Sequence, residues 1–337
     1  VQKMVLISKQ QNITSIADFI AARYGKSQTL AVVVALICLV GVLPYIALQL
    51  KGIVLGVNLL IGASADATGT RVQDTALVVS LVLALFAIVF GTRSLDVTEH
   101  HRGMVLAIAF ESLIKLLAFL AVGIFVVFNL YDGFDDLFTQ ARQSIELHDY
   151  WTETINWPSM VVQTAVAMMA IICLPRQFHV TVVENIEPQD MRLARWVFPM
   201  YLALAALFVV PIALAGQMLL PGTVMSDSFV ISLPLAEAHP SLALLAFIGG
   251  ASAATGMVIV EAVALSTMVS NDMLLPWLLR RNNAERPFEV FRHWMLSVRR
   301  VTIVVILLLA YVSYRLLGST ASLATIGQIA FAAVTQL

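Results

Sequence analysis

Apolar residues form long runs along the chain, and short polar segments separate them. A helix that crosses a lipid bilayer needs about 20 mainly apolar residues. Seven runs are long enough to be full spans, and an eighth run, at 321–337, is expected to be a span that is cut short. The pattern therefore predicts an all-α polytopic membrane protein with a single transmembrane domain over 1–337. The seven full spans are expected at 28–50, 74–92, 103–129, 158–175, 196–220, 241–270 and 298–317.

Composition narrows the class of protein further. Hydrophobic residues make up 60% of the 337 residues and charged residues 12%, with a net charge of −1. Soluble domains carry about 25% charged residues, so an ordinary soluble domain, a disordered chain and a nucleic-acid binder are all excluded. The two cysteines, Cys38 and Cys173, lie in apolar runs and suggest neither a disulfide framework nor a thiolate metal cluster.

The basic residues predict how the spans are oriented. Alternate connections, starting with residues 1–27, hold fifteen Lys and Arg, whereas the connections on the opposite side hold three. Positive charge stays on the cytoplasmic side of a membrane. Residues 1–27 are therefore expected in the cytoplasm and the acidic loop at 129–158 outside. Within the first segment, residues 14–25 predict a short interfacial helix that Thr14 or Ser15 caps and Gly25 ends.

Charged residues inside spans are costly and are therefore candidates for function. Glu111 and Lys115 lie four apart on one face of the third span, in the order that pairs well. They suit either a packing pair or ion coupling. Glu261 lies deep in the sixth span with no charged partner nearby in the sequence. It suits a proton carrier, or a carboxyl that hydrogen-bonds to a neighbouring helix.

Polar and helix-breaking residues in two other spans suggest a route for a solute. Tyr45 and Gln49 share a face of the first span and suit hydrogen bonds to a solute or to the next helix. Pro175 ends the fourth span, and Arg176 and Gln177 follow at once. Discontinuous helices beside a cavity are typical of secondary transporters, although a proline at a helix end also serves as a plain stop.

Small residues open the sixth span in the sequence GGASAATG, residues 249–256. Such a run allows helices to approach closely, and its carbonyls and hydroxyls also suit an ion. Ser252 and Thr255 supply the hydroxyls. Motifs for enzyme chemistry are absent from the sequence: it has no HExxH, no GxSxG and no glycine-rich phosphate loop. No catalytic residue is therefore predicted.

Several stretches resemble the solute:sodium symporter family. TSIADFIAARYGKSQTLAVVVALICLVGVLPYIALQLKG (14–52) is similar to the segment that enters that family's third core helix, and VSND (269–272) to the end of its eighth. The stretches at 90–123 and 173–185 look like the branch that is fused to bacterial sensor histidine kinases and linked to histidine uptake. The resemblance covers essentially the whole chain.

The resemblance implies a LeuT-type fold of five plus five inverted-repeat helices. The chain would supply core helices three to nine, without the first two and with the tenth truncated. The family's hydroxyl pair on the eighth core helix falls on Gly256 and Met257, and its carbonyl ligand on Ala253. Neither Gly nor Met offers the side-chain oxygen that a hard cation such as sodium prefers. Proton coupling through Glu261 is therefore a rival to sodium coupling.

Two functional hypotheses follow. In the first, the chain takes up a small polar solute, such as histidine or another amino acid, across the bacterial inner membrane, driven by Na⁺ or H⁺. In the second, it is a receptor that binds the solute and regulates a cytoplasmic kinase domain of the same protein and its response regulator. Membrane lipid is the other expected partner, and no cofactor beyond the coupling ion is implied.

Overall fold

The computed structural model describes residues 2–62, 70–91, 102–144, 147, 156–185, 189–276, 288–317 and 322–337. Helix accounts for 88% of this part of the chain, and it contains no strand. The predicted all-α class is therefore confirmed.

Within these ranges, five helices are long and apolar enough to cross a membrane, and a bent pair makes a sixth candidate. Three further apolar helices are shorter in their described parts. The protein is thus consistent with a multi-pass membrane protein. The five are α3 (Gln28–Leu60), α5 (Arg102–Phe125) with a π-helical turn η1 (Val126–Leu130), α10 (Asp190–Ala206) with α11 (Val209–Leu219), α13 (Pro240–Met268) with the π-helical η5 (Val269–Leu274), and α15 (Phe288–Leu317). The bent pair is α8 (Trp157–Cys173) and α9 (Pro175–Phe178), which the π-helical η3 (His179–Val183) extends. The shorter helices are α4 (Thr70–Gly91), the apolar segment Ser226–Ala236 and α16 (Leu323–Val334).

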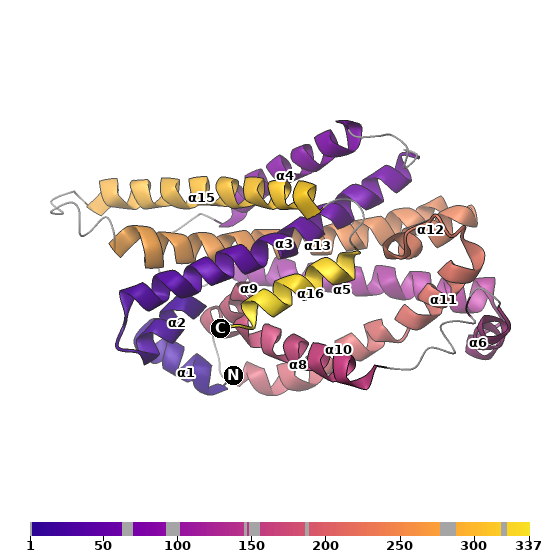
Figure 1. The fold of residues 1–337 in the computed structure, drawn as a ribbon, viewed down its shortest axis with the longest axis horizontal. Helices are drawn as coiled ribbons and strands as arrows, with labels where there is room; N and C mark the ends of the chain where they lie inside the picture. Colours follow the sequence, from indigo (N-terminus) through magenta and orange to yellow (C-terminus); the bar gives the residue numbers. More distant parts are fainter. Residues whose placement is uncertain are drawn as a thin grey trace.

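Short helices occupy the two ends of the molecule. At one end lie α1 (Gln2–Gln11) and α2 (Ile16–Arg23), and at the other lie α6 (Phe134–Gln143) and α12 (Phe229–Ala236), which follows the 3-10 turn η4 (Ser226–Ser228) (Figure 1). Ser15 caps α2 by accepting a hydrogen bond from the backbone N–H of Asp18, and Gly25 follows the helix with a φ of 69°. This short helix was predicted correctly, because its cap and its stop are both local signals.

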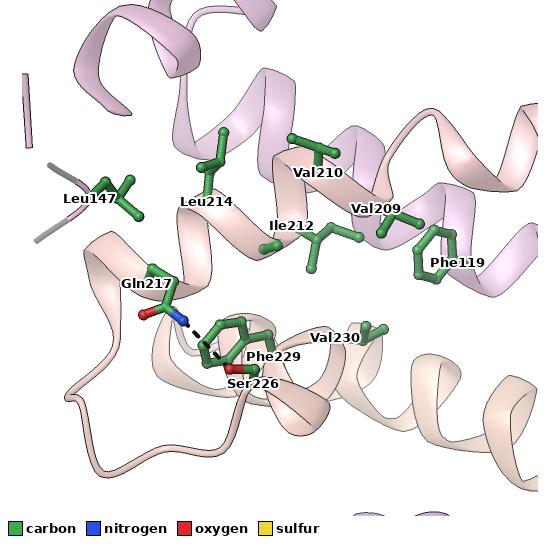
Figure 2. Close-up of a pocket in the computed structure, with 11 residues that line it drawn as sticks. Phe119, Leu147, Val209, Val210, Ile212, Leu214, Gln217, Ser226, Phe229 and Val230 are labelled. Atoms are coloured by element: carbon green, nitrogen blue, oxygen red, sulfur yellow. Dashed lines mark hydrogen bonds between the residues drawn. The ribbon is translucent and has the colours of Figure 1, made fainter. Parts of the chain in front are cut away.

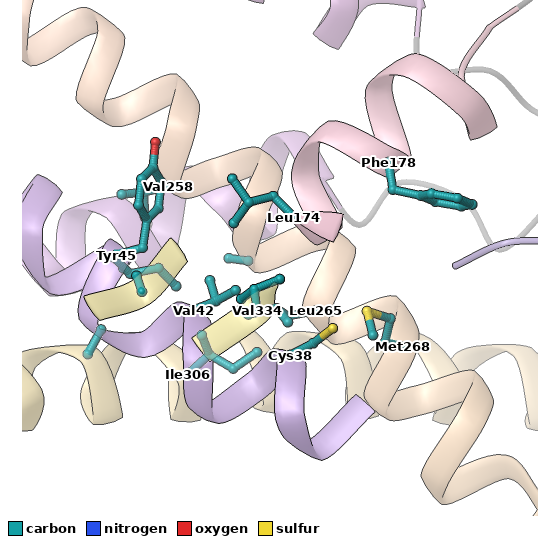
Figure 3. Packing of buried hydrophobic residues seen from close by; sticks show 14 of the residues in the cluster. Cys38, Val42, Tyr45, Leu174, Phe178, Val258, Leu265, Met268, Ile306 and Val334 are labelled. Carbon is teal, nitrogen blue, oxygen red and sulfur yellow. The ribbon is translucent and has the colours of Figure 1, made fainter. Parts of the chain in front are cut away.

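The α3 and α13 helices form the centre of the fold. They pack against each other, and α3 also packs against α15 and α16 (Figure 1). Figure 3 shows the apolar side chains that these helices bury together, including Val42, Val258, Leu265 and Ile306. A second apolar cluster surrounds η1, α11 and α12 at the opposite end from α1 and α2. Both clusters enclose positions that the span predictions placed in apolar runs.

The outer face of the bundle is apolar. No residue of α10 is buried, and α8 buries only Ala170. Trp196 and Met200 on α10 expose 71% and 70% of their surface. Exposed apolar side chains in such numbers are typical of helices that face lipid or other membrane helices.

Candidate functional site

The break between α8 and α9 positions the first charged residue of the site. Leu174 is extended, with φ −63° and ψ 125°, and Pro175 starts α9 at an angle of 51° to α8. Proline has no N–H for the preceding helix, and it also disfavours helical backbone in the residue before it. The predicted discontinuity at Pro175 is therefore present. It turns Arg176 into the bundle, where its side chain is only 12% exposed.

Arg176 lies between an aromatic ring and a carboxylate. Its Nε is 3.9 Å from Oε2 of Glu261 on α13, and its guanidinium carbon is 5.3 Å from the centre of the Tyr45 ring on α3. The second distance is within the range of cation–π contacts. Three residues predicted from separate spans thus meet at one point.

Glu261 is fully buried at this point. None of its side-chain surface is exposed, and neither carboxylate oxygen makes a well-formed hydrogen bond with a described residue, although the backbone N–H of Arg176 also acts on the carboxylate. Buried polar atoms are nearly always hydrogen-bonded, and each exception calls for an explanation. An ion pair at 3.9 Å without a hydrogen bond holds Glu261 more loosely than the usual charge-assisted contact of about 2.7–2.9 Å.

A second pair of charges comes from α5, which packs along α13. The carboxylate of Glu111 lies against Gly256, so closely that a Cβ at that glycine would be 1.8 Å from Oε2. Lys115, one turn further along α5, lies within electrostatic range of Arg176. Glu111, Lys115 and Arg176 therefore approach, from α5 and α9, the helix that carries Glu261.

The small residues of α13 serve close packing. A Cβ at Gly249 would be 2.6 Å from the Cβ of Ala118 on α5, so the glycine permits the approach of the two helices. The Thr255 hydroxyl donates to the carbonyl of Ala251, 2.8 Å away, while Ser252 and Ala253 are half-buried. Of the two uses predicted for the small residues at 249–256, close helix packing is therefore the one observed at Gly249.

The side chains at positions 256 and 257 supply no oxygen for a sodium ion. Gly256 has no side chain, and the Sδ atom of Met257 accepts a hydrogen bond from the Tyr45 hydroxyl at 3.5 Å. A thioether is a poor ligand for a hard cation. In the described part of the chain, no group of three or more His, Cys, Asp or Glu side chains forms a metal site.

The other predicted solute residues lie near this point without joining it. Gln49 is half-buried one turn beyond Tyr45 on α3. Gln177 follows Arg176 on α9, and its carbonyl accepts a hydrogen bond from the Thr181 hydroxyl. The Tyr45 ring also stacks on Phe331 of α16, with centroids 5.9 Å apart.

Two polar clusters near the end that carries α1 and α2 were not predicted as sites. Ser15 donates to the Asp272 carboxylate at 2.7 Å, which ties α2 to the π-helical end of the sixth span. Nε2 of His179 lies 3.3 Å from Oε1 of Glu184, and both side chains are buried. Both clusters have a signal in the sequence, namely the VSND stretch at 269–272 and the polar residues after Pro175. The partners were not predictable, because Ser15 is distant in the sequence and Glu184 lies on another turn.

A cavity of about 490 Å³ lies elsewhere, between α11, α12 and α5 (Figure 2). Its lining is almost entirely apolar, and among the described lining residues only Gln217 and Ser226 have polar side chains, whose Nε2 and Oγ atoms are 3.5 Å apart. None of the residues predicted to bind solute or ion is among the described lining residues. The polar site and this cavity are therefore separate.

Comparisons with known protein families, with curated proteins and with solved structures find no match for the chain. Its function therefore has to be inferred from its own residues.

Proposed function

We propose that the chain is the membrane domain of a secondary transporter. It takes up a small polar solute, an amino acid such as histidine, by alternating access across the bacterial inner membrane, and it has a LeuT-type arrangement of inverted repeats. The resemblance to the solute:sodium symporters and the bent span at Pro175 support this proposal. Discontinuous membrane helices are a recurrent way to build a solute site in secondary transporters.

The observation that carries the proposal is the buried pair of Arg176 and Glu261 at that break. Removing each ion from water costs several kcal/mol, and a hydrophobic pair of the same volume often stabilises a protein equally well. A loose pair with orphaned carboxylate oxygens therefore contributes little to stability. Charges of this kind within a membrane typically mark a pathway for a solute or a proton.

Coupling to protons is favoured over coupling to sodium. The family's hydroxyl pair is replaced by Gly256 and Met257, and the sulfur of Met257 is turned to Tyr45. Glu261 offers a carboxyl that accepts and releases a proton without a bound metal. We therefore propose that the proton gradient drives uptake and that Glu261 carries the proton.

The test is uptake of radiolabelled histidine by proteoliposomes that contain the full chain. A proton gradient and a sodium gradient are imposed separately, with protein-free liposomes as the control. Accumulation under the proton gradient alone is the expected result. Histidine binding without accumulation under either gradient would instead favour a receptor, and accumulation under sodium alone would overturn the assignment of the coupling ion.

A further inference from the structure

The pairing of Arg176 gives information about the solute itself. Its guanidinium has five N–H donors in a planar fork, a geometry that matches the two oxygens of a carboxylate. The contact with Glu261, 3.9 Å from Nε, is longer than a hydrogen bond. Apart from a contact with the Tyr45 hydroxyl, the guanidinium donors of Arg176 are thus available to a better-placed acceptor.

The two partners also differ in how they can be reached. Arg176 keeps 12% of its side chain exposed, whereas Glu261 has none. A solute therefore meets Arg176 first. The Tyr45 ring covers the guanidinium on another side and holds it in place.

From this geometry we infer that the solute carries a carboxylate, which replaces Glu261 as the partner of Arg176 while Glu261 takes up a proton. The inference deepens the proposed transport function and rests on it. It assigns Arg176 as the residue that binds the solute's carboxylate, and Glu261 as the residue that competes with it.

The charges balance through the exchange. Before binding, the guanidinium and the Glu261 carboxylate neutralise each other. One proton then binds a carboxylate oxygen of Glu261, the ion pair breaks, and the solute's carboxylate pairs with Arg176. On the other side of the membrane, the solute and the proton leave and the pair forms again. Neither step leaves an unpaired charge of Arg176 or Glu261 in the bundle, a state that would be strongly disfavoured.

Other titratable groups surround this exchange. Tyr45 and Cys38 face Glu261 from α3, and Lys115 acts on Arg176 from α5. Lys115 adds positive potential near the guanidinium. That potential favours an anionic group over a neutral one at the same place.

The experiment compares acids with their amides. The thermal stability of the purified full chain is measured with amino acids and simple monocarboxylic acids, each matched with its amide, for example histidine with histidinamide. We expect one or more acids to raise the melting temperature where the matched amide does not. If no acid stabilises the wild type more than its amide does, the inference is overturned, and this comparison requires no variant.

Variants and pH then test the exchange. Arg176→Gln should abolish the effect of the acid, Arg176→Lys should weaken it, and Arg195→Gln, on the exposed face of α10, should leave it unchanged. In the wild type, one linked proton makes the dissociation constant rise with pH by up to about tenfold per unit. Glu261→Gln should remove this dependence, whereas the exposed Glu237→Gln should keep it. A wild-type affinity that does not change with pH would refute the role of Glu261.

Failure of this inference and failure of transport give different results. If histidine uptake is inhibited equally by an acid and its amide, the carboxylate is refuted and transport stands. If acids bind through Arg176 and no uptake occurs under any gradient, the carboxylate site is supported and transport is refuted.

Discussion

Breaking the buried ion pair should have a measurable and reciprocal energetic effect. The pair joins Arg176 to Glu261 at 3.9 Å. Coulomb's law at that distance gives about 4 kcal/mol for an effective dielectric constant of about 20, and about 1 kcal/mol for that of water. We therefore expect a coupling energy of about 1–4 kcal/mol between the two side chains.

A double-mutant cycle measures this coupling. The free energy of unfolding is determined for the wild type, Arg176→Gln, Glu261→Gln and the double variant by titration with SDS in mixed micelles. Each single variant leaves an unpaired charge and should be destabilised, whereas the double variant should recover most of the loss. The same cycle on Arg195 and Glu237, which are both exposed, is the control and should give no coupling.

Additive effects of the two substitutions would contradict this prediction. Independent sites add to within about 0.3–0.5 kcal/mol, so a coupling energy in that range would show that Arg176 and Glu261 do not interact in the folded protein. A double variant that is less stable than both single variants would lead to the same conclusion.

Two further predictions concern other positions. Gly256→Ala should displace the Glu111 carboxylate, whose Oε2 would be 1.8 Å from the new Cβ, and should lower histidine uptake. Gly250→Ala is the control, because its new Cβ has open space around it and uptake should be unchanged. Equal uptake by the two variants would refute a role for the contact between Glu111 and Gly256. Outside the membrane, hydrogen bonds from the Gln140 side chain and from the backbone N–H of residue 132 lower the pKa of Asp136 below its usual value. The stabilisation of α6 by these bonds should therefore be constant above about pH 4, the unfolded value, and should be lost as the pH falls through the lower folded value. Hydrogen exchange of the α6 amides at a series of pH values should show this loss, and protection that falls between pH 7 and pH 5 would contradict it.

Much of the architecture was predictable, because the apolar runs carry it. The third span, expected at 103–129, corresponds to α5 and η1 over 102–130, and the sixth, expected at 241–270, to α13 over 240–268. The break at Pro175 was also predictable, because proline disrupts the helix at its immediate neighbours. The fifth span contains a break that was not predicted, because α10 and α11 are separated at residues 207–208. Pro211 accounts for the break, since it has no N–H to donate to the carbonyl of residue 207 and its ring clashes with that carbonyl.

The contacts of the site were less predictable. Glu261 had no local partner in the sequence, and its partner proves to be Arg176, 85 positions away on another span. Hydropathy and helical periodicity describe one element at a time, so they select buried charges without pairing them. Glu111 shows the same limit, because its close neighbour is Gly256 on a different helix.

Proton-coupled uptake through Glu261 is tested most directly by the behaviour of Glu261→Gln in two transport assays. Glutamine resembles the protonated carboxyl, so Arg176 stays free for the solute, but the empty carrier retains an unpaired buried charge and cannot return. We therefore expect the variant to exchange labelled for unlabelled histidine across the proteoliposome membrane. We also expect that it does not accumulate histidine under a proton gradient. Accumulation at the wild-type rate, or loss of exchange in a variant that is still folded, would contradict these expectations.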